Sequence, residues 1–108
     1  MRPGSLQPVA AWSCLWYLRR NAMPEISRFF GIVIRIFYND HEPAHFHASY
    51  GDDEALIVIE TLAVLRGSLP RRALALVLEW AALHRDELRR DWDLARSGQP
   101  PLPIEPLD

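Results

Sequence analysis

Hydrophobic and polar residues alternate with two different periods along this chain, and the first half has the pattern of a sheet. Residues 29 to 38 are mostly β-branched or aromatic and lack a polar helical face, which predicts a strand. Asn39-Asp40 ends it, and Pro43 disfavours a helix in the segment that follows. From His45 to Tyr50 polar and apolar residues then alternate, so we predict a second strand with two chemically different faces.

Further strands follow closely after the second one. Gly51-Asp52-Asp53 predicts a turn, residues 54 to 60 a third strand, and residues 62 to 66 a short fourth. Every connection is too short for a parallel crossover. The sequence therefore predicts an antiparallel meander of three to four strands.

The period changes to that of a helix over residues 68 to 97. Ser68 is a candidate cap, Pro70 suits a first turn, and Gly98 supplies a stop. One apolar stripe should pack on the sheet, made of Leu74, Val77, Leu78, Ala81, Leu88, Trp92 and Ala95. We therefore expect an α+β fold in which the three- to four-stranded antiparallel meander packs on one long C-terminal helix.

A second apolar stripe, formed by Leu76, Trp80 and Leu83, is expected to point away from the first. Two interpretations are open. In the first, the proline-rich tail from Pro100 to Leu107, or the curl of the sheet, covers the stripe. Alternatively it is a surface for a small protein partner or a second copy of the chain, because an exposed Trp between leucines is costly unless something buries it.

Length and composition fit one domain and a reducing compartment. The 108 residues are 49% hydrophobic, enough for a single core over residues 23 to 108. The one cysteine, Cys14, excludes an intramolecular disulfide, which favours a cytoplasmic protein. From Met23 onward nine arginines face fourteen acidic residues. This acidic balance lacks the broad basic footprint of a general nucleic-acid binder.

The first 22 residues look different from the rest. They carry three arginines and no acid, and their apolar run from Val9 to Leu18 is too short to cross a bilayer. We interpret residues 1 to 22 as an extension outside the fold or a mis-assigned start, with Met23 as the true beginning. The rival interpretation is an amphipathic surface anchor. No membrane-embedded protein is expected.

Three of the four histidines, His41, His45 and His47, fall within seven residues. Because side chains alternate along a strand, His45 and His47 share one face, with Cβ atoms ~6.6 Å apart. That face lies opposite Phe46, Ala48 and Tyr50, so we expect the pair to face solvent. His41 could fold back as a third ligand, with Asp40, Glu42, Asp52 or Asp53 as carboxylate candidates. A divalent metal such as zinc would then be bound.

Three uses of this cluster are open from the sequence. It can be a polar face that contacts a partner, a metal site, or a metal-free acid–base pair like those that cleave RNA through its 2′-hydroxyl. The last use needs cations at the phosphate, for which Arg28, Arg35, Arg71 and Arg72 are available. His84 is a further catalytic candidate, although a boundary residue on the helix is its simpler interpretation.

The chain also resembles a small bacterial family, the domain of unknown function numbered 4160, from Met23 to about Leu107. The resemblance rests on order, spacing and residue type at Pro24, residues 26–31, residues 38–47, Tyr50-Gly51, Glu60-Thr61, Leu69-Pro70, Trp80, His84, Leu88 and Trp92. It implies a short cytoplasmic protein encoded beside another small protein, similar to a toxin-antitoxin pair. It assigns no catalytic residue.

Two functions follow as hypotheses. The first is a small binding or regulatory protein that acts with a partner, as one half of a toxin-antitoxin-like module. The alternative is a small nuclease or phosphoester hydrolase that uses His45 and His47 with His41 or His84, with or without a metal.

Overall fold

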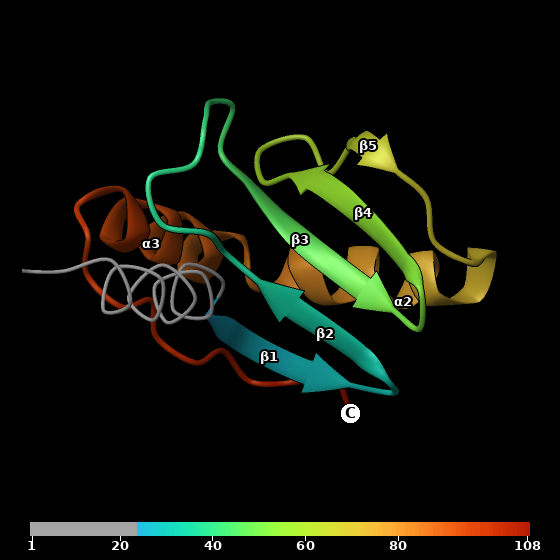
Figure 1. The fold of residues 1–108 in the computed structure, drawn as a ribbon. Coiled ribbons are helices and arrows are strands. Elements are labelled where there is room, and N and C mark those ends of the chain that lie inside the picture. The colour runs from blue at the N-terminus through green and yellow to red at the C-terminus, as the bar shows by residue number, and fades with distance from the viewer. Residues whose placement is uncertain (1–23) are drawn as a thin grey trace, which may run out of the picture.

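The β half of the chain forms one antiparallel sheet of five strands in the order β1-β2-β3-β4-β5 (Figure 1). The computed structural model describes residues 24–108. The strands are β1 (Glu25–Phe29), β2 (Ile32–Arg35), β3 (His45–Tyr50), β4 (Asp53–Val58) and β5 (Val64–Gly67). Each strand pairs with its neighbour in sequence. The predicted α+β class and antiparallel meander are confirmed, with five strands in place of three to four.

The extra strand arises because the apolar run over residues 29 to 38 contains a hairpin turn. Phe30 and Gly31 both have positive φ, at 50° and 80°, the pattern of a two-residue turn that matches the twist of antiparallel strands. β1 ends before this turn and β2 begins after it. The prediction of one continuous strand was wrong because an aromatic residue stands where such turns usually carry Asn, Asp or Gly.

The predicted long helix is two helices, α2 (Arg71–Leu83) and α3 (Arg85–Arg96). They are separated at His84, whose φ of −122° lies outside the helical range. α2 has Pro70 at its N-cap and no side-chain cap, so Ser68 does not cap it. The break changes the chain's direction, so α2 runs beneath the strands while α3 lies near the end of the sheet (Figure 1).

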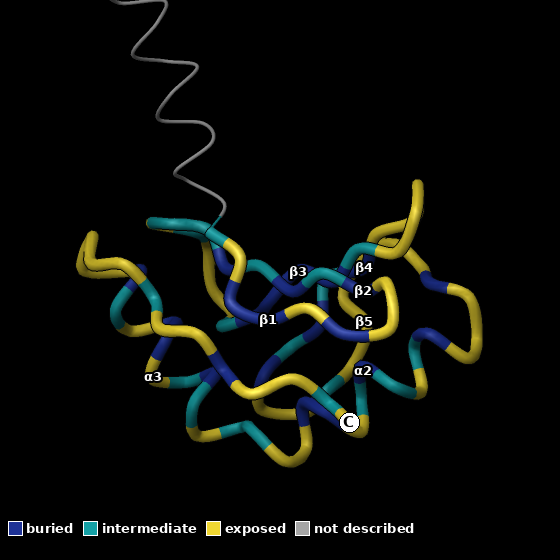
Figure 2. Tube along the Cα trace, turned by 90° about the horizontal axis from the view of Figure 1, so that it is seen from below, coloured by how far each residue is buried: buried dark blue, intermediate teal, exposed yellow. Residues whose placement is uncertain are grey.

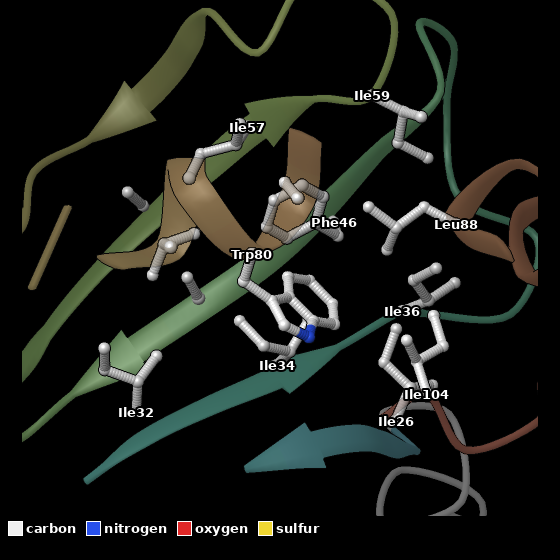
Figure 3. Packing of buried hydrophobic residues seen from close by; sticks show 14 of the residues in the cluster. Ile26, Ile32, Ile34, Ile36, Phe46, Ile57, Ile59, Trp80, Leu88 and Ile104 are labelled. Carbon is white, nitrogen blue, oxygen red and sulfur yellow. The ribbon is translucent and has the colours of Figure 1, made fainter. Parts of the chain in front are cut away.

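The hydrophobic core lies between the sheet and the helices, which occupy one side of it (Figure 2). Figure 3 shows Trp80 of α2 among side chains from β1, β2, β3 and β4, together with Ile104 of the tail. Phe29 and Phe46 lie beside its indole, with ring centroids 5.4 and 6.0 Å away. The largest fully buried apolar side chains are Trp80, Phe46, Ile26, Ile32, Ile34, Ile36, Ile57, Ile59, Leu88 and Val77.

Trp80 is therefore not part of an exposed partner surface. It follows Val77 by three residues, which places the two side chains about 60° apart on the helix rather than on opposite sides. Its indole N–H donates to the Glu105 carbonyl at 2.8 Å, so the tail covers it, as one of the two interpretations predicted. Leu76 packs against the core, and only Leu83, at 67% exposure, remains open.

The tail is held along the outer edge of the sheet. The Ile104 N–H donates to the Ile26 carbonyl beside β1, and the Leu102 N–H donates to the buried carboxylate of Asp91. The predictions about residues 1 to 22 lie outside the described residues. Within the described range, no helix has the length and apolar character needed to span a membrane.

Candidate metal centre

His45 and His47 lie on the same face of β3, as the strand alternation predicts, and their ring centroids are 5.2 Å apart. They are not exposed to solvent, however, because only 4% and 7% of their surfaces are accessible. Phe37 stacks flat on the His47 ring at 3.9 Å, and Trp92 of α3 lies 5.2 Å from the His45 ring. The prediction of a solvent-facing pair was wrong because the segment after β2 and the bent helix cover this end of the sheet.

A third side chain, Asp40, completes the site from the loop between β2 and β3. Its Oδ2 atom lies 3.0 Å from His45 Nε2 and 3.3 Å from His47 Nε2. Ligand-type atoms of these three residues all lie within 4.8 Å of one another. We call Asp40, His45 and His47 the His–Asp cluster.

Contacts with α3 hold the loop that carries Asp40. The Asn39 N–H donates to the Ala95 carbonyl at 3.3 Å, and the Arg96 guanidinium donates to the Glu42 carboxylate at 2.6 Å. The His41 N–H donates to Asp40 Oδ1 at 2.8 Å, which leaves Oδ2 for the histidines. Local hydrogen bonds and α3 together therefore orient the carboxylate.

The other nitrogen of each histidine ring faces an acceptor. His45 Nδ1 lies 2.7 Å from the Pro43 carbonyl oxygen, and His47 Nδ1 lies 3.1 Å from Glu54 Oε2. A carbonyl oxygen and an ionised carboxylate accept hydrogen bonds and donate none, so each Nδ1 must carry the proton. In the neutral rings, both Nε2 atoms then present lone pairs toward Asp40.

Three electron-pair donors thus converge on one point and require positive charge between them. Either both rings take a second proton and become imidazolium ions, or a cation binds Nε2, Nε2 and Oδ2 together. Zinc–ligand bonds of 2.0–2.2 Å with angles near 90–110° place neighbouring ligand atoms roughly 2.8–3.6 Å apart. The two observed separations, 3.0 and 3.3 Å, match that spacing.

The electrostatics of Asp40 suit either state. Burial alone raises the pKa of this carboxyl, but the hydrogen bonds from the His41 N–H and from His47, with the nearby histidine charges, outweigh burial. The net effect lowers the pKa of Asp40 below its ordinary value. Asp40 is therefore ionised at neutral pH, as a ligand or an ion-pair partner must be.

The structure does not bring the other two candidate histidines to this site. His41 is exposed, and only its backbone N–H contributes. His84 lies at the break between the helices, where its ring contacts Trp80 and pairs with Glu87. Of His41 and the four carboxylate candidates, Asp40 is the one that reaches both histidines, because the folded loop directs its carboxylate at the pair and leaves the His41 ring exposed.

Sequence reasoning also missed Glu54. It pairs with Ser49 across β3 and β4, so it is a diagonal neighbour of His47 on the same face. Only the register of this hairpin shows the contact. A cavity of about 200 Å³ lies elsewhere, between Phe30, Tyr50, Arg72 and Leu76, and it contains none of the cluster residues.

The fold and the cluster define a small α+β domain with a candidate site of two histidines and one carboxylate. The family model for the domain of unknown function DUF4160 matches residues 31–93, more than half of the chain. The chain therefore belongs to this family, and the match spans the whole cluster with both of its supporting acceptors. No curated protein and no solved structure matches the chain.

Proposed function

We propose that the protein is a metal-dependent phosphoester hydrolase whose divalent ion is held by the His–Asp cluster. The observation that carries the proposal is the hydrogen bonding of the two Nδ1 atoms, which directs both Nε2 lone pairs at Asp40 Oδ2. Metal-binding histidines commonly donate their second N–H to a carbonyl or a carboxylate, and Pro43 and Glu54 supply these two acceptors here.

The ligand count favours a catalytic rather than a structural ion. Structural zinc sites use four protein ligands, whereas catalytic sites use three and leave a position for water or substrate. Three residues form the cluster within residues 24–108, and Asp40 is the most accessible of them. The open position therefore lies on the Asp40 side, and zinc suits the two nitrogen ligands and one oxygen ligand.

The chain's own residues supply orientation and exclusion of water. Phe37 and Trp92 cover the two rings, and Asp40 is the most accessible of the three cluster residues. Glu54 accepts from His47 Nδ1 and raises the basicity of Nε2. A divalent ion bound here would lower the pKa of a coordinated water and polarise a phosphoryl oxygen.

Metal analysis of the full-length protein, purified without a histidine tag, tests the site. Zinc and manganese should each bind with a stoichiometry of one per chain in isothermal titration calorimetry, and a His45→Ala/His47→Ala double variant should bind neither. His41→Ala and His84→Ala are matched controls, because both histidines lie outside the cluster. Equal loss of binding in His41→Ala and in the double variant would contradict the proposed ligand set.

Hydrolysis of a chromogenic phosphodiester tests the reaction. The wild-type protein with zinc or manganese should release the chromophore, and Asp40→Asn should reduce the rate by at least ~10²-fold because it removes the anionic ligand. A protein that binds one metal ion and hydrolyses neither phosphodiesters nor phosphomonoesters would refute the enzymatic part of the proposal.

The metal-free acid–base mechanism is the second form of this proposal. Its support is the pair of short contacts to Asp40, which fit imidazolium ions as well as metal ligands. Cleavage of RNA that persists in excess chelator and is lost in the double variant would establish this form in place of the metal-dependent one.

A second candidate function is the binding of a small protein partner, as in a toxin-antitoxin-like pair. Burial of Trp80 removes its original support, but the outer edge of β5 pairs with none of the strands in the described part of the chain. Val64 and Leu65 on this strand are 42% and 50% exposed. Such an edge can add a strand from another chain.

A charge placed on the edge strand tests this candidate. Leu65→Lys should abolish co-purification with the product of the adjacent gene, since charged side chains on an edge strand oppose strand addition. Leu83→Lys is the matched control, because Leu83 is exposed on α2. If both variants retain the partner, or if neither the wild type nor the variants associate with it, this candidate fails.

A further inference from the structure

The side of the sheet that faces away from the helices carries a row of residues from four strands. Arg35 on β2 pairs with His47 on β3, His47 pairs with Leu56 on β4, and Leu56 pairs with Arg66 on β5. Directly paired residues of antiparallel strands point to the same side of a sheet. We call Arg35, His47, Leu56 and Arg66 the cross-strand row.

The row places a cation beside the His–Asp cluster and a second one farther away. Arg35 is the direct neighbour of His47, with Cβ atoms about 5 Å apart. Arg66 lies two strands beyond His47, or ~10 Å across the sheet. The two arginines therefore flank His47 in the row, with Arg35 next to it and Arg66 two strands away.

Neither arginine forms a salt bridge within residues 24–108. Arg28, Arg89 and Arg96 each form ion pairs with carboxylates, and Arg90 pairs with Asp91. Arg35 and Arg66 form no such pair with any residue that the structure describes, although both lie on a domain rich in acids. Arg35 has one carboxylate nearby, that of its cross-strand neighbour Glu25 on β1, but Arg28 already donates two hydrogen bonds to that group. The guanidinium groups of Arg35 and Arg66 therefore keep their N–H donors for an anion that approaches the cluster.

Between the two arginines the row holds His47 and Leu56, and its neighbours on the same face are small or apolar apart from the exposed Glu54. Val33, Ser49, Leu56 and Val58 are all half-buried, whereas His47 is covered by the Phe37 ring. Such a surface suits sugar and base faces better than a second layer of phosphates. It also lacks the broad basic area that a duplex requires.

We propose that this face binds a single-stranded nucleic acid, with Arg35 holding the phosphate at the His–Asp cluster and Arg66 holding a phosphate farther along the strand. The inference rests on the proposed hydrolase function, because it identifies the phosphodiester substrate of that same site. Guanidinium groups suit phosphate oxygens because they donate two parallel hydrogen bonds.

Binding of a short fluorescein-labelled oligothymidylate with phosphorothioate linkages by the full-length protein tests the proposal, since these linkages keep the negative charge and resist hydrolysis. Fluorescence anisotropy is measured with zinc present over a series of salt concentrations. Arg35→Gln and Arg66→Gln should each weaken binding by about tenfold, the usual cost of losing a charged hydrogen bond. Each should also reduce the slope of log K against log salt by about 0.7, as expected for one phosphate contact on a single strand.

Arg71→Gln is the matched control. Arg71 is an exposed arginine at the start of α2, on the other side of the sheet, so its substitution removes the same charge without touching the row. It should leave both the affinity and the salt slope within twofold of the wild type. An Arg71→Gln effect equal to that of Arg66→Gln would overturn the proposal, because the binding would then follow net charge alone.

Two further measurements separate this proposal from the proposed function. Zinc titration of Arg35→Gln and Arg66→Gln should give wild-type affinity, which shows that each variant folds with an intact cluster. Competition by thymidine monophosphate should be at least tenfold weaker than competition by unlabelled oligothymidylate. Zinc binding without any oligothymidylate binding would refute this inference and leave the metal site standing, and equal competition by the mononucleotide would refute the strand-like substrate.

Discussion

Strand β3 has two buried faces that are stabilised in opposite ways. Phe46 and Ala48 belong to the hydrophobic core, whereas His45 and His47 lie on the opposite face of the strand and contact hydrogen-bond acceptors. Burial of the first pair is favourable by itself, at roughly 25 cal/mol per Å² of apolar surface. Burial of the second pair is unfavourable unless every ring nitrogen finds a partner.

This difference explains why the two faces have different consequences for function. The apolar face tolerates any arrangement that fills its volume, so it defines the fold and little else. The polar face needs Pro43, Glu54 and Asp40 at particular atoms, so it defines a site. A partly satisfied polar cluster would be worse than an apolar one, which makes the full set of contacts around the histidines informative.

The largest effect is expected from removing the side chain that packs against the apolar face of β3. Trp80→Ala should lower the free energy of unfolding by about 3–5 kcal/mol, because a fully buried indole leaves a large cavity and loses its bond to Glu105. Urea denaturation followed by circular dichroism measures the change. Leu83→Ala should stay within about 0.5 kcal/mol. A small effect of Trp80→Ala would mean that the tail does not cover this residue.

Zinc should stabilise the folded protein through the polar face of β3, because the apolar face offers no ligand atoms. Zinc at one hundred times its Kd should raise the free energy of unfolding by about 2.7 kcal/mol, because it binds only the folded cluster. Thermal denaturation with zinc and with chelator measures the difference. His47→Ala should show no zinc effect and His41→Ala should keep it. Stabilisation of His47→Ala by zinc would place the ion elsewhere.

A smaller change tests the support of His47. Glu54→Gln should weaken zinc binding by about tenfold, at the lower end for such supporting groups, because the half-exposed Glu54 is partly replaced by water. Competition with a chromogenic chelator measures the affinity. Glu60→Gln, which changes an exposed carboxylate that pairs with Arg89, should leave the affinity unchanged. Equal effects of the two substitutions would indicate general electrostatics.

The smallest effect concerns Asp91, a buried carboxylate on α3 with one unpaired oxygen. Burial raises its pKa, against the opposing bonds from the Leu102 N–H and Arg90. The folded protein therefore binds this proton more tightly than the unfolded chain, and the stability that it contributes is lost as pH rises through the raised pKa. Relative to wild type, Asp91→Asn should gain stability as pH increases from about 4 toward neutrality. Urea denaturation at several pH values measures this difference, and a constant difference would contradict burial as the cause.

Several features could be predicted from particular residues alone. The alternation from His45 to Tyr50 predicts β3 and the shared face of its two histidines, and the short connections predict the meander. The turn at Phe30-Gly31 was missed because positive φ at a phenylalanine leaves no signal in composition. The break at His84 was missed because no proline or glycine marks it.

The candidate site could also be predicted only in part from the sequence. Its two histidines are evident from the sequence, and their burial is not, because Phe37 and Trp92 reach them from segments that only the folded chain brings together. The burial of Trp80 was likewise left open by the sequence, because it depends on a tail residue, Glu105, that follows it by 25 residues.

By itself, the sequence determined the class of fold, the polar and apolar faces of β3 and the place where chemistry concentrates, because side-chain period is a local property of the backbone. Tertiary structure alone decided that Asp40 rather than His41 completes the cluster, that Glu54 supports it, and that Arg35 and Arg66 share its face. These relations depend on strand register and on a bent helix, and both are set by how the whole core packs.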